Sequence, residues 1–158
     1  MSAQPQPRLT PEEYLEIERN AEFRSEYYNG RMYAMAGGSP NHGRIIGNLT
    51  GELHAALKKG PCDVIPNDLR LLVSPVGLYT YPDVIVVCGE MQLAEGTKDT
   101  LVNPTLVVEV LSPTTEAYDR GFKSSHYRTI ESLRNTRSSR SISRASKSIA
   151  ASPPEPGS

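Results

Sequence analysis

The sequence predicts an α/β or α+β fold in which helices pack against a sheet. Apolar residues recur at helical spacing over 10–19 and 39–60, with a strand pattern between them. Short β-rich runs broken by Pro, Gly and Asn follow, and a last helical pattern covers about 116–133. This order of elements is typical of a sheet with helices packed on it.

The β-rich runs lie between the second and third helical patterns. They cover 62–66, 69–73, 84–88 and 105–111, and each is too short and too rich in branched residues to predict a helix. No internal repeat is present. A chain of 158 residues with these elements is expected to form one domain with a modest core.

The net charge of −1 excludes a protein that binds nucleic acid through overall positive charge alone. The charge is divided unevenly along the chain. Residues 1–134 hold 13 Lys and Arg against 17 Asp and Glu, a net charge of −4, whereas 135–158 hold four against one, a net charge of +3.

The first helix has a clear start signal. Residues 1–8 are polar, contain proline and are expected to form a flexible leader. Thr10 then precedes Pro11, which suits the first helical position, and Glu13 stands three residues after Thr10. These residues predict a capping box.

A turn and a second helix come next. Asn29 and Gly30 are a strong signal for a tight turn, and the alternation over 32–36 predicts a strand. Ser39 is expected to cap the second helix, and Gly60, which follows two lysines, is expected to end it.

The two cysteines lie in separate β-rich runs, and no signal peptide indicates an oxidising compartment. Cys62 and Cys88 are therefore expected to be unpaired, small buried side chains. No Cys or His spacing predicts a zinc site, and no apolar run is long enough to span a membrane. The expected location is the cytoplasm, without membrane association.

Two carboxylates stand in or beside the most apolar runs. Asp83 directly precedes 84–87, which is typical of a strand buried on both faces. Glu109 interrupts the apolar run 106–111. A carboxylate in such a strand is costly to desolvate unless it is paired, neutral or metal-bound. If the two strands are neighbours, both carboxylates can point into one pocket.

A lysine follows these acids on the last helical pattern. Lys123 shares one helix face with Asp119, His126 and Tyr127. Two carboxylates that hold Mg²⁺, with a lysine beside them, form a site suited to phosphodiester cleavage, because the metal activates water and the lysine orients it. Mg²⁺ suits carboxylate oxygens and keeps several water ligands.

These motifs resemble a known family. "YPDVIVV", followed by "LVVEVLSPTTEAYDRGFKSSHYR", resembles the PD-(D/E)XK nuclease superfamily, and more narrowly is similar to the Uma family of restriction endonucleases. "EEYLEIE", "SEYYNGRMYAMAGGSPNHGRIIGNL", "PCDVIPNDLRLLV" and "GLYTYPDV" are similar to the same family. The resemblance covers about residues 9–134. It implies a restriction-endonuclease-like α/β fold, with a mixed central sheet flanked by helices, and Mg²⁺- or Mn²⁺-dependent hydrolysis of DNA.

The resemblance also assigns site residues. Asp83 matches the acid of the PD motif and Glu109 the second acid, and both would hold the metal. The superfamily's usual lysine position, two residues after the second acid, is Leu111 here, and the displaced lysine of the Uma family maps to Lys123. Glu26, in "SEYYNG", matches an N-terminal acid that could add a ligand or accept a proton.

Each candidate also has an interpretation without catalysis. Asp83 could cap its strand, and Glu109 could form a structural ion pair with a cation of the last helix. Lys123 could pair with Asp119 one helical turn away, and Glu26 could be a solvated charge at a helix end.

His42, in "SPNHG", could touch phosphate, but an ordinary loop or first-turn position is the simpler interpretation. The same stretch lacks the Gly-Lys-Ser/Thr ending of a P-loop, so a P-loop is rejected.

Residues 135–158 differ in kind, because they are rich in Ser, Arg and Pro and are expected to be disordered. The family pattern continues with a strand resembling "EYVLVS", whereas this chain has "NTRSSRS". Degenerate codons for residues 135–142 permit "EYALVSQY" after one added G. We therefore expect that a one-base deletion near the codon for Arg134 left the last core strand or strands missing.

Two further hypotheses remain beside the nuclease. The basic tail could be a flexible arm of a non-catalytic nucleic-acid-binding protein, or the chain could be a remnant without function. DNA is the expected partner both of the nuclease and of the binding protein. The sequence does not decide whether the chain forms a homodimer. Metal dependence separates the nuclease from the binding protein.

Overall fold

The computed structural model describes residues 7–35, 37–74, 76–112 and 118–134. Its strands form a five-stranded mixed sheet in the order β2-β1-β5-β4-β7 and a three-stranded antiparallel sheet in the order β3-β6-β8. The strands are β1 (Ser25–Tyr28), β2 (Arg31–Ala34), β3 (Cys62–Pro66), β4 (Arg70–Val73), β5 (Leu78–Thr80), β6 (Val84–Cys88), β7 (Thr100–Leu101) and β8 (Leu106–Val108). The predicted α/β class is confirmed, but the strands form two sheets and not one.

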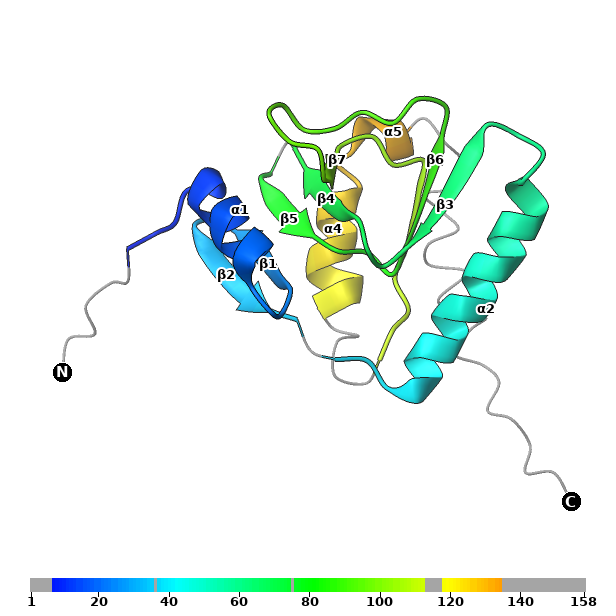
Figure 1. The fold of residues 1–158 in the computed structure, drawn as a ribbon, viewed down its shortest axis with the longest axis horizontal. Coiled ribbons are helices and arrows are strands. Elements are labelled where there is room, and N and C mark those ends of the chain that lie inside the picture. Colours follow the sequence, from blue (N-terminus) through cyan, green and yellow to red (C-terminus); the bar gives the residue numbers. More distant parts are fainter. Residues whose placement is uncertain (1–6, 36, 75, 113–117, 135–158) are drawn as a thin grey trace, which may run out of the picture.

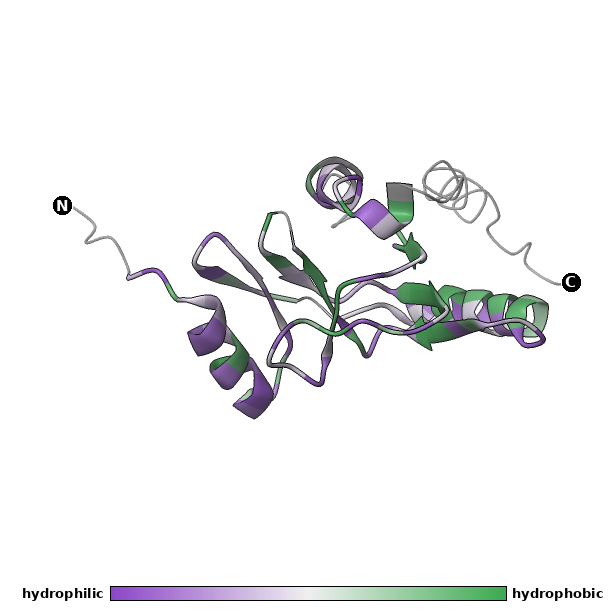
Figure 2. Cartoon of the chain, turned by 90° about the horizontal axis from the view of Figure 1, so that it is seen from above, coloured by the Kyte–Doolittle hydropathy of each residue, from purple (hydrophilic) through white to green (hydrophobic). Residues whose placement is uncertain are grey.

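Helices cover the strands from several sides. Figure 2 shows α1 (Pro11–Asn20) and the C-terminal helical segment on opposite sides of the strands. Helix α2 (Pro40–Leu57) lies beside β3 (Figure 1). The C-terminal helical segment consists of a π-helical turn, η1 (Asp119–Lys123), then α4 (Ser124–Tyr127) and α5 (Glu131–Arg134). No helix in the described part of the chain is both long and apolar enough to cross a bilayer.

The N-terminal elements form as the local signals predict. The Thr10 hydroxyl accepts the backbone N–H of Glu13, and the Glu13 carboxylate accepts the backbone N–H of Thr10, which is the expected capping box. Asn29 and Gly30 both have positive φ, at 49° and 82°. Positive φ at both central positions matches the right-handed twist of a hairpin, so β1 and β2 pair directly across this turn.

Helix α2 begins where the sequence predicts. The Ser39 hydroxyl accepts the backbone N–H of His42, which satisfies one of the unpaired donors of the first turn. The helix ends at Leu57, three residues before the predicted Gly60. Its apolar side packs through Ile46 against Val84 and other valines of the three-stranded sheet.

Strand β6 is buried on both faces, as predicted from its sequence. Val84 packs toward α2, whereas Ile85 and Val87 belong to the main core with Val107 of β8. That core also contains Tyr127, Ile130 and Leu133 of the C-terminal helical segment, together with Leu71, Val73, Leu78 and Leu101 of the five-stranded sheet. Alternate residues of β6 and β8 therefore face different helices.

The C-terminal helix is less regular than the sequence predicts. The prediction of a single helix over about 116–133 is wrong for the described residues. Helix α4, which continues directly from η1, ends at Tyr127, and α5 begins only at Glu131. The Thr129 hydroxyl donates to the carbonyl of His126, and this side-chain bond competes with helical backbone pairing. Ile130 is buried in the main core at the break.

Other sequence predictions have mixed outcomes. Strands β5 and β7 were not predicted, since runs of three and two residues carry little pattern. The expected leader before Pro7, the tail 135–158 and the missing strands of the frameshift hypothesis lie outside the described residues.

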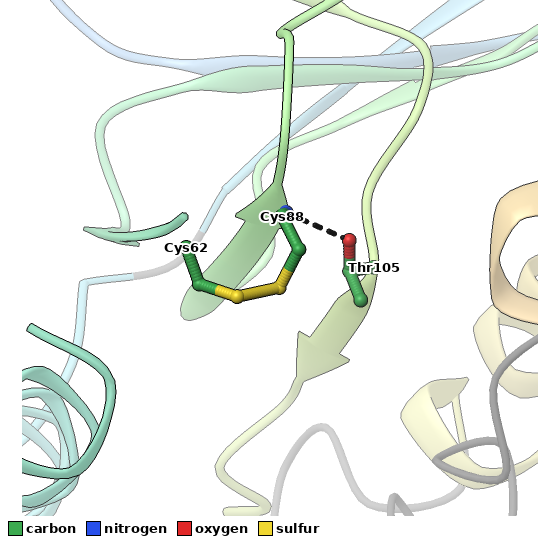
Figure 3. Close-up of a disulfide and its surroundings, with 3 residues drawn as sticks. All are labelled: Cys62, Cys88 and Thr105. Carbon is green, nitrogen blue, oxygen red and sulfur yellow. Dashed lines mark hydrogen bonds between the residues drawn. A yellow bond between two sulfur atoms is a disulfide. The ribbon is translucent and has the colours of Figure 1, made fainter. Parts of the chain in front are cut away.

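A disulfide joins β3 and β6 (Figure 3). Cys62 and Cys88 lie directly opposite each other in the antiparallel register, with Cα atoms 3.9 Å apart. Cys88 is exposed, and its backbone N–H donates to the Thr105 hydroxyl just before β8. The expectation of two buried, unpaired thiols is therefore wrong. The pairing follows from the register of two strands, which the sequence spacing of 26 does not determine.

Reduction of this disulfide should destabilise the fold. The bond closes a loop between residues 26 positions apart, and in the chain-entropy model its loss lowers the free energy of unfolding by about 3.5 kcal/mol. Urea unfolding with and without dithiothreitol measures the difference, and a Cys62→Ser/Cys88→Ser variant should not respond to the reductant. Two thiols that react with iodoacetamide in the unreduced, folded chain would contradict the disulfide.

Candidate active site

The pairing of β6 with β8 brings the two predicted acids together. Val84 lies opposite Val108 in the antiparallel register, so Asp83, just before β6, and Glu109, just after β8, are neighbours. Glu109 points toward the C-terminal helical segment, where it meets Lys123 and Tyr127, whereas Asp83 lies between that segment and the start of α2, where it meets His42. The strand pattern that builds the core thus ends in a pair of acids.

Lys123 and Glu26 complete a buried ion cluster. The Lys123 Nζ lies 3.1 Å from Glu26 Oε1 and 3.5 Å from Glu109 Oε1. All three residues are more than nine-tenths buried. Glu26 comes from β1, so the cluster joins the N-terminal hairpin, the three-stranded sheet and η1.

Two tyrosine hydroxyls hold the carboxylates of this cluster. The Tyr127 hydroxyl donates to Glu109 Oε1 at 2.5 Å, and burial is the main cause that raises the pKa of Tyr127 well above its ordinary value. The Tyr118 hydroxyl donates to Glu26 Oε2 at 2.6 Å. Lys123 Nζ also lies 5.3 Å from the centre of the Tyr118 ring, within the range of a cation–π contact.

Asp83 is held from the side of α2. Its Oδ2 accepts the backbone N–H of Val110 at 2.6 Å and lies 3.5 Å from His42 Nε2. The same nitrogen of His42 is 3.0 Å from the Val110 carbonyl oxygen. Burial raises the pKa of Asp83, and the Val110 N–H, His42, Lys123 and a hydrogen bond with Glu109 oppose that rise only in part.

All four predicted site residues line one cavity of about 740 Å³. The structure therefore brings Glu26, Asp83, Glu109 and Lys123 together, although they are spread over almost 100 positions of the sequence. The cavity also reaches His42 and the segment between β2 and α2.

The donor chemistry of the cavity suits a hard cation. Among the described residues, no three His, Cys, Asp or Glu side chains gather closely enough to hold a metal by themselves. Mg²⁺ does not require such a set, since it commonly binds one or two carboxylates and completes its shell with water and substrate oxygens. Asp83 and Glu109, which are neighbours at the ends of β6 and β8 and line the same cavity, provide two carboxylates of this kind.

The structure also decides among several non-catalytic interpretations. Glu26 is a buried strand residue, so a solvated helix-end charge is wrong. Asp83 does accept a backbone N–H near its strand, and Glu109 does form an ion pair with Lys123. The alternative partner Asp119 has a side chain outside the described part of the chain.

Sequence reasoning missed three contacts of the site. His42 is in the first turn of α2, as predicted, but it touches Asp83 and the Val110 carbonyl. The sequence does not predict the contact of Tyr118 with Glu26, and it predicts the helix face of Tyr127 but not its bond to Glu109. The aromatic residues five positions before and four positions after Lys123 were the available signal.

Replacement of Asp83 by Asn should stabilise the metal-free chain at neutral pH. The pKa of Asp83 is raised in the folded chain, so the protonated carboxyl stabilises the fold. This stabilisation is complete below the ordinary carboxyl pKa of 3.8 and is lost as the pH rises through the raised folded-state pKa. The Asp83→Asn variant avoids this loss. Its free energy of unfolding should exceed that of the parent at pH 7 in EDTA, and the difference should shrink toward pH 3.8.

Asp63→Asn is the matched control, because Asp63 is an exposed acid on the neighbouring strand β3. Its free energy of unfolding should stay close to that of the parent at every pH. A less stable Asp83→Asn variant at pH 7 would show that the contacts with Val110 and His42 outweigh the cost of burial.

Two curated relatives come from Synechocystis sp. (strain ATCC 27184 / PCC 6803 / Kazusa). The uncharacterized protein slr1290 is 43% identical over 119 residues, which cover 75% of this chain and 62% of slr1290. The uncharacterized protein sll1609 is 34% identical over 125 residues, which cover 79% of this chain and 71% of sll1609. The chain thus spans less than two thirds of the length of slr1290.

A solved structure has a similar fold. The crystal structure of "a putative nuclease belonging to DUF820" from Anabaena variabilis ATCC 29413 matches with a TM-score of 0.61 and 21% identity, over 75% of this chain and 66% of that chain. The family model Uma2, described as "Putative restriction endonuclease", matches residues 11–135. A match over this much of the sequence shows that the chain belongs to the Uma2 family.

Proposed function

We propose that this chain is a metal-dependent endonuclease that hydrolyses phosphodiester bonds of DNA. The observation that carries the proposal is that Asp83 and Glu109 lie side by side at the ends of paired strands and line one cavity with the buried Lys123. Family membership supports the same class of reaction.

Asp83 and Glu109 are the proposed ligands of Mg²⁺ or Mn²⁺. When bound, the metal would neutralise charge on the scissile phosphate and lower the pKa of an attacking water. The raised pKa of Asp83 agrees with such a role, since a nearby cation would replace the proton that the buried carboxyl otherwise favours.

Lys123 is the proposed group that orients water. Its ammonium has three N–H donors, and Glu26 and Glu109 hold it at the cavity wall. A donor fixed in this way can also stabilise negative charge that develops on the phosphate. Glu26, which contacts Lys123, could accept a proton from the attacking water. The Tyr127 hydroxyl positions Glu109 by its hydrogen bond.

We further propose a cytoplasmic location, where cellular DNA is accessible. Glutathione and thioredoxin keep most thiols reduced in that compartment. The Cys62–Cys88 disulfide would then belong to an oxidised form of the chain.

Glu109→Gln should abolish metal-dependent cleavage. The substitution keeps the size of the side chain but removes the charge of one proposed ligand, and a loss on the order of a hundredfold or more is expected. Plasmid and oligonucleotide substrates, incubated with Mg²⁺, Mn²⁺ or EDTA, measure it. Glu52→Gln is the control, because Glu52 is exposed on α2 and outside the cavity.

Equal cleavage by the parent and by Glu109→Gln would indicate a contaminating nuclease and overturn the proposal. DNA binding that needs no metal and no Glu109, without any cleavage, would support the alternative of a non-catalytic nucleic-acid-binding protein.

A further inference from the structure

The wall of the cavity is rich in aromatic side chains and poor in Lys and Arg. The described lining includes five aromatic side chains: Tyr28, Tyr33, Tyr81, Tyr118 and Phe122. In the same lining Lys123 is the one Lys or Arg, and Glu26 and Glu109 already neutralise it. The protein part of this cavity therefore has little positive charge to offer to several phosphates, but it has a large aromatic surface.

Tyr33 stands at the open side of this wall. It lies directly opposite Glu26 in the β1–β2 register, so both side chains project from the same face of the hairpin. Glu26 is buried in the ion cluster, whereas Tyr33 is 49% exposed although it lines the cavity. Its ring is thus beside the acid cluster and accessible from solvent.

Other rings build the wall behind it. The Tyr118 and Phe122 rings are stacked, with centroids 5.2 Å apart and planes 12° from parallel. Phe122 also meets Tyr28 edge-on, with centroids 5.0 Å apart. These contacts keep flat apolar surfaces next to Lys123 and Glu26, within reach of a group that enters past Tyr33.

We propose that the cavity takes an unpaired nucleotide of DNA, with the Tyr33 ring stacked on its base. This inference rests on the nuclease function proposed above. A nucleic acid offers phosphates, sugars and bases, and a wall rich in aromatic side chains, in which the acids Glu26, Asp83 and Glu109 outnumber the one lysine, suits the uncharged base. Stacking on aromatic side chains is how many proteins hold single strands without reading sequence.

The state of the DNA follows from the same contact. Within a duplex, neighbouring base pairs cover both faces of each base, so a protein ring that does not wedge between base pairs can stack on a base only where the strand is single or the nucleotide is flipped out. The cavity volume of about 740 Å³ lies within the range of pockets that enclose small organic groups. The substrate class is therefore DNA with an unpaired base beside the bond to be cleaved.

Fluorescence anisotropy tests this directly, with a labelled single-stranded oligonucleotide and the matching duplex in EDTA, so that no metal-dependent cleavage occurs. The full chain should bind the single strand more tightly. Tyr33→Leu should raise the Kd for the single strand on the order of tenfold, whereas Tyr33→Phe should keep it, because the ring and not the hydroxyl is needed. Phe23→Leu is the control, since Phe23 is 76% exposed and lies outside the cavity.

The outcomes separate this inference from the proposed reaction. Tyr33-dependent binding of single strands supports the inference even if no metal produces cleavage, a result that would overturn the nuclease proposal alone. The inference is overturned if the duplex binds as tightly as the single strand, or if Tyr33→Leu and Phe23→Leu change the Kd equally. If the inference is overturned in either way but cleavage of DNA depends on Glu109, the nuclease proposal still stands.

Discussion

The burial of the Lys123 ammonium is the constraint on which the site depends. Lys123 is 5% exposed, and an ammonium removed from water to this degree costs several kcal/mol unless opposite charge lies close to it. Glu26 and Glu109 provide that charge from β1 and from the end of β8. The ion pairs of one cation thus connect the hairpin, the three-stranded sheet and the C-terminal helical segment around the cavity.

The change from core to site takes place at the ends of two paired strands. Ile85, Val87 and Val107 fill the main core, and Asp83 and Glu109 flank the same strands. Each apolar residue there stabilises the fold, whereas the raised pKa of Asp83 indicates that its ionised form is not well compensated. A buried acid of this kind lowers stability and is a candidate functional group.

Features that depend on near neighbours in the chain were predictable. The Thr10 capping box, the Asn29-Gly30 turn and the Ser39 cap each need contacts within three residues or so, and all three form. The paired acids were predictable because a carboxylate in an apolar strand is unusual. Their assignment to one site also needed the family resemblance, since the lysine is absent from its usual position.

Features that depend on strand register or tertiary packing were not predictable. The Cys62–Cys88 bond, the division into two sheets and the contact of His42 with Asp83 follow from how distant segments meet. At the break after Tyr127 the Thr129 hydroxyl bonds the His126 carbonyl and Ile130 is buried in the core, and a helical repeat in the sequence does not reveal either contact. Such features need the pairing of β3, β6 and β8 to be known first.

The most direct test of the central claim is metal binding by the carboxylate pair. Mn²⁺ should be titrated into the full chain and the unbound ion followed by electron paramagnetic resonance, with Asp83→Asn and Asp63→Asn as variants. We expect saturable Mn²⁺ binding that Mg²⁺ displaces. Asp63→Asn should keep this binding, and Asp83→Asn should weaken it at least about tenfold. Equal binding by both variants, or no binding by the parent chain, would show that Asp83 and Glu109 do not form a metal site.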